Sequence, residues 1–549
     1  MEHNHNMTDY AQCYRNFRLE VPEYYNFAVD VVDKWAEKDD KPALLCVDDF
    51  GNETQYTFGD LKEKSDRAGA LLQRIGVNKG DRVFVMLPRI PQWWEIVLGI
   101  LKAGAVAMTG TVQLMPKDIA YRIKISEAKV AITDLENAPK IDEVKDQCPQ
   151  LETLIIVGGR RPGWVSYSDE MNRPENFVPV KTKSSEDAIL YFTSGTTGYP
   201  KMVLHTHASY PLAHLVTGKY WLDLKPWDRH WNVSDNGWAK AAWSSLFGPW
   251  HMGSEVFVHN TKGRFNPKLT LELIEKYKIT TLCAPPTAYR LFVFEDLSSY
   301  DFSSLRHCVS AGEPLNPEVI SIWEKHTGLK IYDGYGQTET VVLVANFPCM
   351  EIKPGSMGKP VPGFKVDIID ENGVPLPGGE EGSIAVNVSE SRPVGMFKEY
   401  WKDPEGTRSR FKQGWYLTGD RAYKDEDGYF WFVGRADDVI ISAGYRIGPF
   451  EVESALIEHP AVVEAAVVGS PDPVRGEIVK AFVILADGYE PSEELAKEIQ
   501  EFVKSNTAPY KYPREIEFVE SLPKTISGKI QRVKLREEER RRKLSLNKD

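Results

Sequence analysis

Residues 191–201 read YFTSGTTGYPK, and this stretch decides which fold the rest of the sequence has to build. It continues an apolar run, 188–192, that has the length and composition of a buried strand. The eight residues from Ser194 to Lys201 hold three Ser or Thr hydroxyls, two glycines and one lysine. Glycines let backbone N–H groups converge on an oxyanion, hydroxyls donate further hydrogen bonds, and lysine adds positive charge. The stretch therefore predicts a strand followed by a loop that cradles a polyphosphate.

This loop is not the common P-loop, because the pattern G-x-x-x-x-G-K-[ST] is absent from the chain. The pair Gly528–Lys529 has Pro523 where the first glycine of that pattern belongs and Ile530 where the hydroxyl belongs. A turn of serine, threonine and glycine that binds no ligand is the alternative interpretation of residues 194–201.

The sequence before and after this loop alternates strand and helix patterns. Thr57 and Asp60 resemble a capping box, and apolar residues then repeat at helical spacing, which predicts a helix over about 58–75. A second helix is expected through 93–101. Apolar runs typical of buried strands lie at 82–87, 105–108, 154–157, 188–192, 255–258 and 280–284. This alternation predicts an α/β fold with mostly parallel, helix-covered sheets.

The texture of the sequence changes twice toward the C-terminus. After about residue 355, Gly and Pro are dense and the strand runs are short, as in a small β-barrel-like subdomain. From Phe450 we expect a compact α+β unit with a helix at 450–458, strands at 461–468 and 478–485, and a helix capped by Ser492. The predicted division is a large N-terminal domain, 1–436, with two α/β subdomains and the β-rich subdomain, and a small C-terminal domain, 437–549.

Composition excludes several classes of protein. The 549 residues are 42% apolar and 27% charged, which is ordinary for a globular chain, and the net charge of −12 argues against a whole-surface binder of nucleic acid or anionic membrane. Six cysteines lie far apart and are expected to be reduced thiols. The most apolar long stretch, 93–108, is interrupted by Glu95 and Lys102. The first ten residues show no signal sequence, so a cytoplasmic location is expected.

Four further motifs follow the loop. They are YGQTE at 335–339, WYLTGD at 415–420, GRADD at 434–438 and PKTISGK at 523–529. With the loop, they resemble in order and approximate spacing the motifs of the adenylate-forming enzymes, which include acyl-CoA and aryl-CoA synthetases, peptide-synthetase adenylation domains and luciferases. The segments AGYRIGP at 443–449, TAPYKYPR at 507–514 and GKIQR at 528–532 are most similar to those of medium-chain acyl-CoA synthetases. Ala443 departs from that pattern, since many relatives have serine there.

The resemblance implies which residues bind ATP. They are Thr193, Ser194, Gly195, Thr196, Thr197, Gly198 and Lys201 in the loop, Gly312, Glu313, Pro314, Asp333, Gly334, Tyr335 and Gln337 near the adenine, and Asp420, Arg435 and Arg446 near the ribose and the adenylate. Asp420 suits the two ribose hydroxyls, because a carboxylate accepts two hydrogen bonds. The alternative for Asp420 is a turn residue without a ligand, and the alternative for Arg435 is a surface ion pair.

Three residues are expected to act on the reacting atoms. A carboxylate that attacks the α-phosphorus of ATP approaches a centre surrounded by negative oxygens, so the site must supply cations and preorganised donors. By resemblance, Lys529 bridges the carboxylate and the α-phosphate, Thr338 faces the α-phosphate, and Glu339 holds Mg²⁺. A solvent-exposed lysine and a surface carboxylate are the alternatives for Lys529 and Glu339.

Coenzyme A must reach the same carbonyl that the lysine loop occupies in the first step, so the small C-terminal domain is expected to swing. The resemblance implies that Asp437 is the hinge. The resemblance places coenzyme A beside residues of the C-terminal domain and one residue of the large domain. They are Gln113, Ala443, Gly444, Tyr445, Arg475, Lys504, Tyr512, Pro513 and Arg514. The basic members of this set could equally be ordinary surface charges.

The acyl pocket is inferred from small residues and an apolar wall. Gly336 stands where acetyl-specific relatives have a tryptophan that closes the pocket, Ala311 is also small, and Trp238 offers an apolar surface. His205 and His207 are interpreted as structural or phosphate-side residues, because no third metal ligand lies nearby. The basic tail after Lys529 is interpreted as a solvated helix with mixed charge pairs, with a polyanion contact as the alternative.

The sequence therefore predicts an ATP-dependent acid–thiol ligase. It would adenylate a short-chain or medium-chain, branched or aryl carboxylic acid with Mg²⁺ and ATP, and would transfer the acyl group to coenzyme A with release of AMP and pyrophosphate. An adenylation enzyme that loads a carrier-protein thiol is the alternative in the same chemistry, and a non-catalytic nucleotide-binding regulator is the alternative from another class. No nucleic-acid or membrane partner is expected. The exact acid and the oligomeric state, including a homo-oligomer, stay open.

Overall fold

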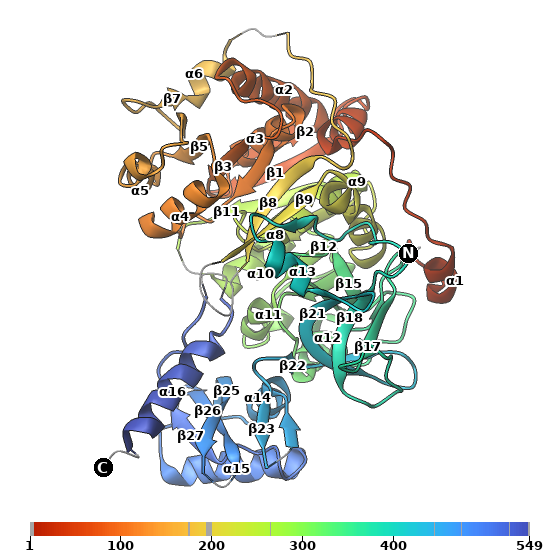
Figure 1. The fold of residues 1–549 in the computed structure, drawn as a ribbon, viewed down its shortest axis with the longest axis vertical. Helices are drawn as coiled ribbons and strands as arrows, with labels where there is room; N and C mark the ends of the chain where they lie inside the picture. The colour runs from red at the N-terminus through yellow and green to blue at the C-terminus, as the bar shows by residue number, and fades with distance from the viewer. Residues whose placement is uncertain are drawn as a thin grey trace.

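The computed structural model describes residues 5–173, 176–193, 200–263, 265–443, 445–473, 475–525 and 528–546. The chain forms two large mixed sheets, a small antiparallel sheet and a C-terminal α+β unit. Figure 1 shows the C-terminal unit, in blue, gathered at one end of the long axis below the rest of the chain. The predicted α/β fold class is confirmed.

The first large sheet has nine strands, and its central pairs are parallel. β2, β15 and β16 run antiparallel at its two edges. In spatial order the strands are β16 (Lys359–Pro360), β15 (Val342–Ala345), β14 (Ile331–Gly336), β13 (His307–Ala311), β12 (Thr281–Ala284), β10 (Arg229–Asn232), β11 (Glu255–Asn260), β1 (Pro42–Asp48) and β2 (Glu53–Thr57).

The second large sheet has eight strands, of which β8 to β7 in spatial order are parallel and β9 and β19 are antiparallel. In spatial order the strands are β19 (Glu399–Tyr400), β9 (Lys201–Thr206), β8 (Asp187–Thr193), β4 (Val106–Thr109), β3 (Arg82–Met86), β5 (Val130–Asp134), β6 (Thr153–Val157) and β7 (Val165–Ser166). Thr193 and Lys201, the residues that flank most of the predicted phosphate loop in sequence, pair across the antiparallel strands β8 and β9.

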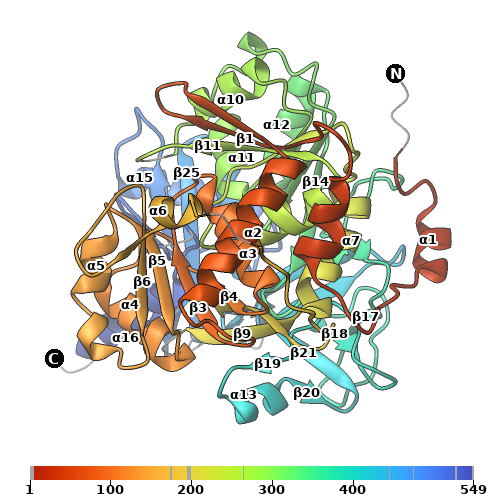
Figure 2. The same ribbon diagram turned by 90° about the horizontal axis from the view of Figure 1, so that it is seen from above.

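Helices α2 (Phe58–Arg74) and α3 (Gln92–Lys102) fill the space between the two large sheets. One apolar cluster joins their buried faces to β1 and β11 of the first sheet and to β3 and β5 of the second. Figure 2 shows the two helices side by side. A Cβ at Gly99 would lie 2.6 Å from the Cβ of Ala68, so this close helix contact depends on glycine. The two sheets are thereby held in one packed body.

The small sheet and the C-terminal sheet are both mostly antiparallel. The small sheet contains β17 (Val366–Ile369), β18 (Gly382–Asn387), β21 (Trp415–Lys424), β20 (Phe411–Lys412) and β22 (Phe430–Arg435). The C-terminal sheet contains β24 (Tyr445–Ile447), β23 (Ile440–Ser442), β26 (Gly476–Leu485), β25 (Val462–Asp472) and β27 (Glu515–Phe518). Residues between Ile440 and Val503 form the buried core of the C-terminal unit without any residue from the earlier part of the chain.

The remaining helices cover the sheets or lie in their connections. They are α1 (Tyr10–Asn16), α4 (Pro116–Ser126), α5 (Ala138–Asp142), α6 (Tyr167–Met171), α7 (His214–Val216), α8 (Ala239–Ala242), α9 (Gly248–His251), α10 (Pro267–Lys276), α11 (Pro286–Phe292), α12 (Pro317–Thr327), α13 (Pro404–Ser409), α14 (Pro449–Ile457), α15 (Glu493–Asn506) and α16 (Arg532–Leu546). No helix within the described ranges combines the length and apolarity that a membrane crossing requires.

The local predictions agree with the structure where strong local signals exist. The Thr57 side chain accepts a hydrogen bond from Asp60 N and the Asp60 carboxylate accepts one from Thr57 N, which confirms the capping box of α2. Ser492 caps α15 as expected. All six cysteines are unpaired, as predicted.

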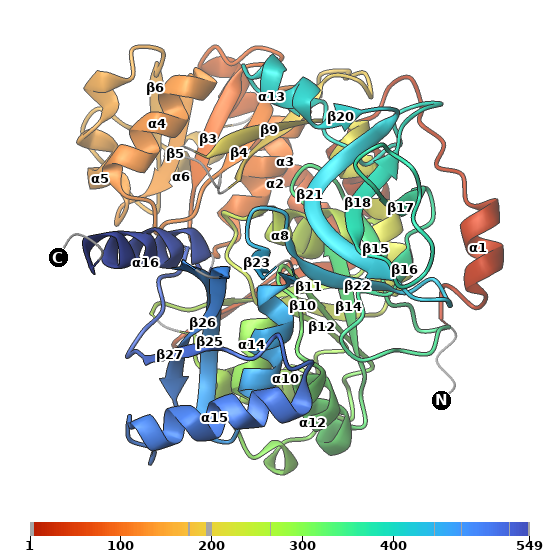
Figure 3. The same cartoon turned by 60° about the horizontal axis from the view of Figure 1, so that its bottom comes forward.

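Helix α16 carries the basic tail and is fastened to the C-terminal sheet by charged groups. Glu539 is 1% exposed, accepts a hydrogen bond from Ser470 Oγ at 2.8 Å and pairs with Lys480 Nζ at 2.7 Å. Arg542 pairs with Glu517 and Lys543 with Glu515, both on β27. Figure 3 shows α16 beside β25 and β26. These internal ion pairs support the interpretation of the tail as a helix with mixed charge pairs.

Replacing Glu539 by Ala should loosen α16. Lys480 keeps Glu517 but loses its most buried partner, and breaking a buried ion pair costs about 3 kcal/mol. We expect faster amide hydrogen exchange in β26 and α16 and a lower urea midpoint. Glu538→Ala, an exposed position on the same helix, is the matched control and should leave both unchanged. Equal behaviour of the two variants would contradict this account of the helix.

Candidate active site

The turn after β14, residues 337–340, lies where the two large sheets meet. His205 on β9 places Nε2 2.7 Å from the carbonyl oxygen of Thr338. Tyr400 on β19 donates its hydroxyl to Glu339 Oε1 at 2.6 Å. Both strands belong to the second sheet, while the turn belongs to the first. The backbone of Thr338 and the carboxylate of Glu339 are therefore held from across the junction.

His205 performs its role as a neutral imidazole. Burial lowers the pKa of His205 to about 4, and the carbonyl of Thr338 can only accept, so Nε2 carries the proton. Nδ1 then accepts from Ser209 Oγ at 3.1 Å. His207 is also fully buried. Among the described residues no group of three or more His, Cys, Asp and Glu side chains could hold a metal ion by itself.

Asp420 and Arg435 stand directly opposite each other on the neighbouring strands β21 and β22. Asp420 is 8% exposed, and its Oδ2 accepts from Tyr335 Oη at 2.5 Å and from Gln337 Nε2 at 2.8 Å. No hydrogen bond to Oδ1 comes from the residues that the structure describes. The arrangement leaves one carboxylate oxygen available to hydroxyl donors of a ligand.

Charges from distant parts of the chain meet around Asp420. Burial raises the pKa of Asp420, while its hydrogen bonds and the positive charges of Arg435 and Lys529 oppose that rise. Lys529 also opposes protonation of Lys240, whose pKa is lowered first of all by burial. The positive charge of Lys529 thus acts on the ionisation of both Asp420 and Lys240.

Lys240 is a candidate site residue that the sequence analysis missed. It lies on α8, directly after Trp238 and Ala239, and donates to the carbonyl oxygen of Ala311 at 2.9 Å. Lys240 thus links the backbone of Ala311 to the short helix α8 that follows Trp238, and Ala311 and Trp238 are two predicted residues of the acyl pocket. A lysine in an apolar, Trp-rich stretch is the sequence signal that could have pointed to it.

The third predicted pocket residue, Gly336, has a packing reason to be glycine. A Cβ there would lie 2.7 Å from the carbonyl oxygen of Val341 and 3.0 Å from the Cα of Val342. The close approach of β14 to the backbone that follows it requires glycine whatever the pocket size. A tryptophan at this position would therefore strain the sheet besides filling a pocket.

The residues expected near the adenine come from two adjacent parallel strands. Ser310 pairs with Asp333 and Ala311 with Gly334, which places Gly312, Glu313 and Pro314 beside the end of β14. Burial raises the pKa of Asp333 to about 8. A carboxyl group that is largely protonated near neutral pH can both donate and accept, which suits the uncharged edge of a purine.

The predicted phosphate loop falls mainly outside the described residues, which exclude Ser194, Gly195, Thr196, Thr197 and Gly198. Its two ends are described, and Thr193 pairs with Lys201 across the hairpin β8–β9. Lys201 Nζ lies 4.6 Å from the ring centroid of Tyr400, the residue that donates to Glu339. The lysine that ends the loop and the Glu339 carboxylate therefore both contact Tyr400.

The predicted coenzyme A residues form two groups on the C-terminal unit. Ala443 donates its N–H to the carbonyl of Arg475 at 2.9 Å and adopts a left-handed φ of 49°. Lys504 and Arg514 lie against the ring of Tyr512, at 5.5 and 5.0 Å from its centroid. Pro513, between Tyr512 and Arg514 in the sequence, is buried. Tyr445 stacks on Tyr510 at 4.3 Å and joins the two groups.

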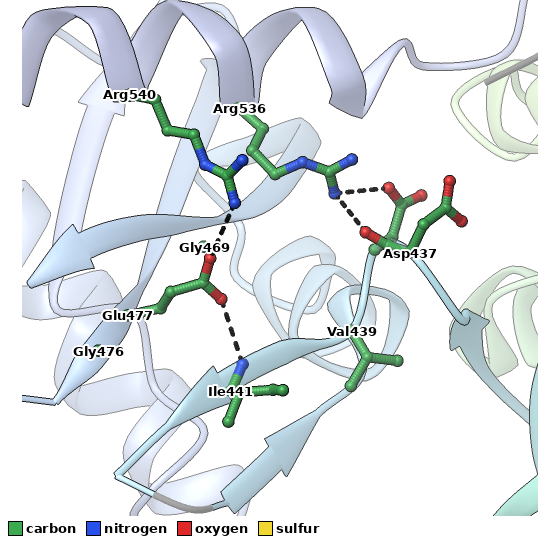
Figure 4. Close-up of a pocket in the computed structure, with 9 residues that line it drawn as sticks. Asp437, Val439, Ile441, Gly469, Gly476, Glu477, Arg536 and Arg540 are labelled. Carbon is green, nitrogen blue, oxygen red and sulfur yellow. Dashed lines mark hydrogen bonds and ion pairs between the residues drawn. The ribbon is translucent and has the colours of Figure 1, made fainter. Parts of the chain in front are cut away.

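Other predicted residues are not brought into these groups. Gln113 lies after β4 of the second large sheet, and no contact within the described ranges joins it to the C-terminal residues. Gly444 and the side chain of Arg446 lie outside the described structure, and the backbone of Arg446 pairs with Ile441. Asp437, the expected hinge, lies beside a cavity of about 410 Å³ that Figure 4 shows.

Sequence and structure comparisons identify what this chain is similar to. The family described as AMP-binding enzyme matches residues 32–401, and the AMP-binding enzyme C-terminal domain matches residues 451–529. The acyl-coenzyme A synthetase ACSM3, mitochondrial, of Rattus norvegicus is 52% identical over 97% of this chain and 94% of its own length. The acyl-coenzyme A synthetase ACSM4, mitochondrial, of the same organism is 50% identical over 94% of this chain and 91% of its own length.

Solved structures give the same picture. The anthranilate CoA ligase AuaEII in complex with anthranoyl-AMP superposes with a TM-score of 0.88 at 34% identity, covering 95% of this chain and 99% of its own. A benzoate CoA ligase from Burkholderia xenovorans LB400 gives a TM-score of 0.81 at 28% identity, covering 93% of this chain and 100% of its own.

The cytoplasmic location predicted from the sequence is contradicted by the curated relatives reported above, which are named as mitochondrial proteins. The prediction depended on finding no signal among the first ten residues. Such an absence does not decide in which compartment a chain works, and composition fits both compartments equally.

Replacing Tyr335 by Phe should weaken nucleotide binding, because Asp420 loses the shorter of its two hydrogen bonds and becomes easier to protonate. One hydrogen bond to a charged group is worth about 1.5 kcal/mol or more, so we expect a loss of affinity for AMP of about tenfold, measured by calorimetry. Tyr332→Phe on the same strand is the matched control, since the structure gives its hydroxyl no hydrogen bond. Equal affinities of the two variants would show that the Tyr335 hydroxyl does not support the site.

Proposed function

The chain belongs to the AMP-binding enzyme family and is an acyl-CoA synthetase, and we propose that it activates a medium-chain carboxylic acid by swinging residues 437–549 between two steps. It uses ATP and coenzyme A and forms an acyl-adenylate on the way to the thioester. The observation that carries the finer proposal is the electrostatic influence of Lys529 on both Asp420 and Lys240. It supports an orientation of the C-terminal unit suited to the first step.

In that step an oxygen of the carboxylate forms a bond to the α-phosphorus while the bond to the β-phosphate oxygen breaks and pyrophosphate leaves. We assign Lys529 to the space between the incoming carboxylate and the α-phosphate, where both are negative. Lys201, beside Tyr400, is suited to the outgoing phosphates. Fixed cations in a partly buried site stabilise the charge of this transition state without reorganisation.

Glu339 fits the role of a Mg²⁺ ligand. Mg²⁺ usually binds through one or two carboxylates together with substrate phosphates and water. Glu339 is a buried carboxylate whose Oε1 is oriented by Tyr400, and no hydrogen bond to Oε2 comes from the described residues. A bound Mg²⁺ would neutralise phosphate charge and polarise the phosphoryl oxygens. Arg410 adds positive charge nearby, since its charge opposes the rise in the pKa of Tyr400 and is itself favoured by Tyr400 and Glu339.

The ribose and the base of the nucleotide are proposed to bind on the side of the site away from the phosphates. Asp420 Oδ1 is suited to accept from the ribose hydroxyls, because Oδ2 is already occupied by Tyr335 and Gln337. Arg435, directly across the ladder, would fix the ribose from its other side. In this position the base would meet Gly312, whose positive φ of 107° turns the chain after β13.

In the second step the sulfur of coenzyme A attacks the acyl carbonyl, AMP leaves and the thiol proton passes to solvent. The two groups around Ala443 and Tyr512 would line the path of the coenzyme after the swing, with Arg475, Lys504 and Arg514 as its cationic contacts. A carrier-protein thiol is the alternative acceptor. The relatives reported above, named as coenzyme A synthetases over nearly the whole chain, favour the free coenzyme.

Replacing Lys529 by Ala should abolish carboxylate-dependent pyrophosphate release, with a loss of at least about a hundredfold, because no other described cation takes its place between the two anions. Thioester formation from supplied acyl-adenylate and coenzyme A should change little. Both rates are measured separately in single-turnover assays with hexanoate.

Lys524→Ala is the matched control for that variant, since Lys524 lies in the same loop but pairs with Glu464 at 2.8 Å. It should keep both rates. An equal loss of both half-reactions in Lys529→Ala would contradict the assigned role, and absence of AMP formation by the unaltered enzyme with a panel of straight, branched and aromatic acids would contradict the proposed substrate class.

Replacing Lys240 by Met should raise the KM for the acid by about tenfold and leave the KM for ATP unchanged, because a buried cation beside the proposed acyl pocket attracts a carboxylate. Lys240→Gln keeps a donor for the Ala311 carbonyl and removes only the charge, so the two variants separate these effects. Burial lowers the pKa of Lys240, so in the wild type the KM for the acid should rise as the pH climbs through that lowered value. An unchanged KM in both variants would remove Lys240 from the pocket.

A further inference from the structure

Helix α16 carries arginines on three successive turns that face the same side. Arg532 donates to both carboxylate oxygens of Glu453, at 2.9 and 2.5 Å. Arg536 donates to the carbonyl oxygen of Asp437 at 2.7 Å and to Asp438 Oδ1 at 2.9 Å. Arg540 lies 3.6 Å from Glu477 Oε1. Figure 4 shows Arg536 reaching the chain at the expected hinge and Arg540 reaching Glu477.

Two sets of hydrogen bonds meet at the hinge, and they differ in which side of Asp437 they join. Asp438 N and Val439 N donate to the carbonyl oxygen of Arg435 at 3.0 and 3.2 Å, so both bonds span Asp437. Arg435 Nε also donates to Asp437 Oδ1 at 3.3 Å. A rotation about the backbone of Asp437 has to break the bonds that span it.

The bonds of Arg536 do not span the pivot. The peptide plane that contains the carbonyl of Asp437 also contains the nitrogen of Asp438, so this plane turns together with the C-terminal unit. The second acceptor, the Asp438 carboxylate, lies further along the chain. Arg536 can therefore keep both acceptors while Asp437 rotates, and the part of the chain free to turn ends at Asp437.

Space beside the hinge is available for this rotation. The cavity of about 410 Å³ is lined by Asp437, Asp438, Val439, Glu477, Arg536 and Arg540. Arg536 is 17% exposed and Asp438 9%, so their ion pair is shielded while the cavity opens beside it. The planar guanidinium suits a carbonyl and a carboxylate at once, which a lysine cannot reach with fixed geometry.

We propose that Arg536 is a positioning residue that fastens the downstream end of the hinge to α16 and thereby sets where Lys529 and the coenzyme A residues come to lie. The inference rests on the proposed swing of residues 437–549. Helix α16 begins three residues after Lys529, and its segment from Arg532 to Arg536 spans about 6 Å. If the downstream end of the hinge moved, this short link would pass the displacement on to Lys529.

Arg536→Ala should lower the rates of both half-reactions by about ten- to a hundredfold, since errors of about 1 Å in position cost that much. The KM values for ATP and hexanoate should change little, because the proposed contacts to both substrates, except that of Lys529, belong to the earlier part of the chain. The rates are measured as pyrophosphate release and as thioester formation from hexanoyl-adenylate. The joint loss distinguishes Arg536 from Lys529, whose removal should affect pyrophosphate release alone.

Arg541→Ala is the matched control, because it removes the same charge from an exposed position of the same helix and should leave both rates unchanged. Asp438→Ala in the Arg536→Ala background should add no further loss, since the pair acts as one unit. Arg536→Lys keeps the charge, and if the alanine variant does not fold, it should show a smaller joint loss with unchanged KM values.

Three results would overturn the inference: unchanged rates in Arg536→Ala, a loss confined to one half-reaction, or the same loss in Arg541→Ala. Each of these presupposes an unaltered enzyme that forms AMP and thioester. If the unaltered enzyme released no AMP, the proposed function would fail, and this outcome is separate from an active enzyme that tolerates loss of Arg536.

Discussion

The ammonium group of Lys529 influences the ionisation of both Asp420 and Lys240, although Lys529 lies near the end of the chain and its neighbours come from sheets completed much earlier. Positive charge is needed there because two anions, a carboxylate and a triphosphate, must approach each other closely. Lys240 is less suited to supply that charge alone, since burial lowers its pKa. An exposed lysine on a separate unit keeps its charge in water and brings it to the site only when that unit is in place.

The rest of the site is built to hold its anionic and polar groups still. The turn at 337–340 belongs to one large sheet but is fixed by His205 and Tyr400 of the other, so Glu339 cannot move without disturbing the junction between them. His205 contributes geometry without charge, because burial keeps its imidazole neutral. Asp420 has one oxygen committed to protein donors and one available. Fixed groups on the large body and a movable cation on the small one divide the work between them.

How much the sequence could predict follows the range of each interaction. The capping box of α2, the cap of α15 and the predicted strands of both large sheets depend on neighbours along the chain, and they were predictable. The role of Lys240 depends on Ala311, and that of Tyr400 on Glu339. Both contacts are non-local, so the sequence could at most mark Lys240 as an unusual lysine in an apolar stretch without showing its partner. Gly336 shows a second limit of prediction from sequence. Its lack of a side chain is required by a close backbone contact and also fits the proposed pocket, and the sequence alone does not separate the two reasons. The compartment had no physical signal in the folded chain.

Helix α16 shows why a basic tail need not bind a polyanion. Five of its basic side chains form ion pairs with carboxylates, namely those of Glu453, Asp438, Glu477, Glu515 and Glu517. The buried Glu539 of the same helix pairs with Lys480 of the sheet. Such a density of pairs contributes little on the exposed side of the helix, where water screens it, and more on the side that faces the sheet. What the pairs provide is rigidity between the hinge and Lys529. A domain that reorients as a whole can deliver a lysine accurately only if its internal links do not bend, so the stiffness of α16 and the freedom of Asp437 are two halves of one requirement.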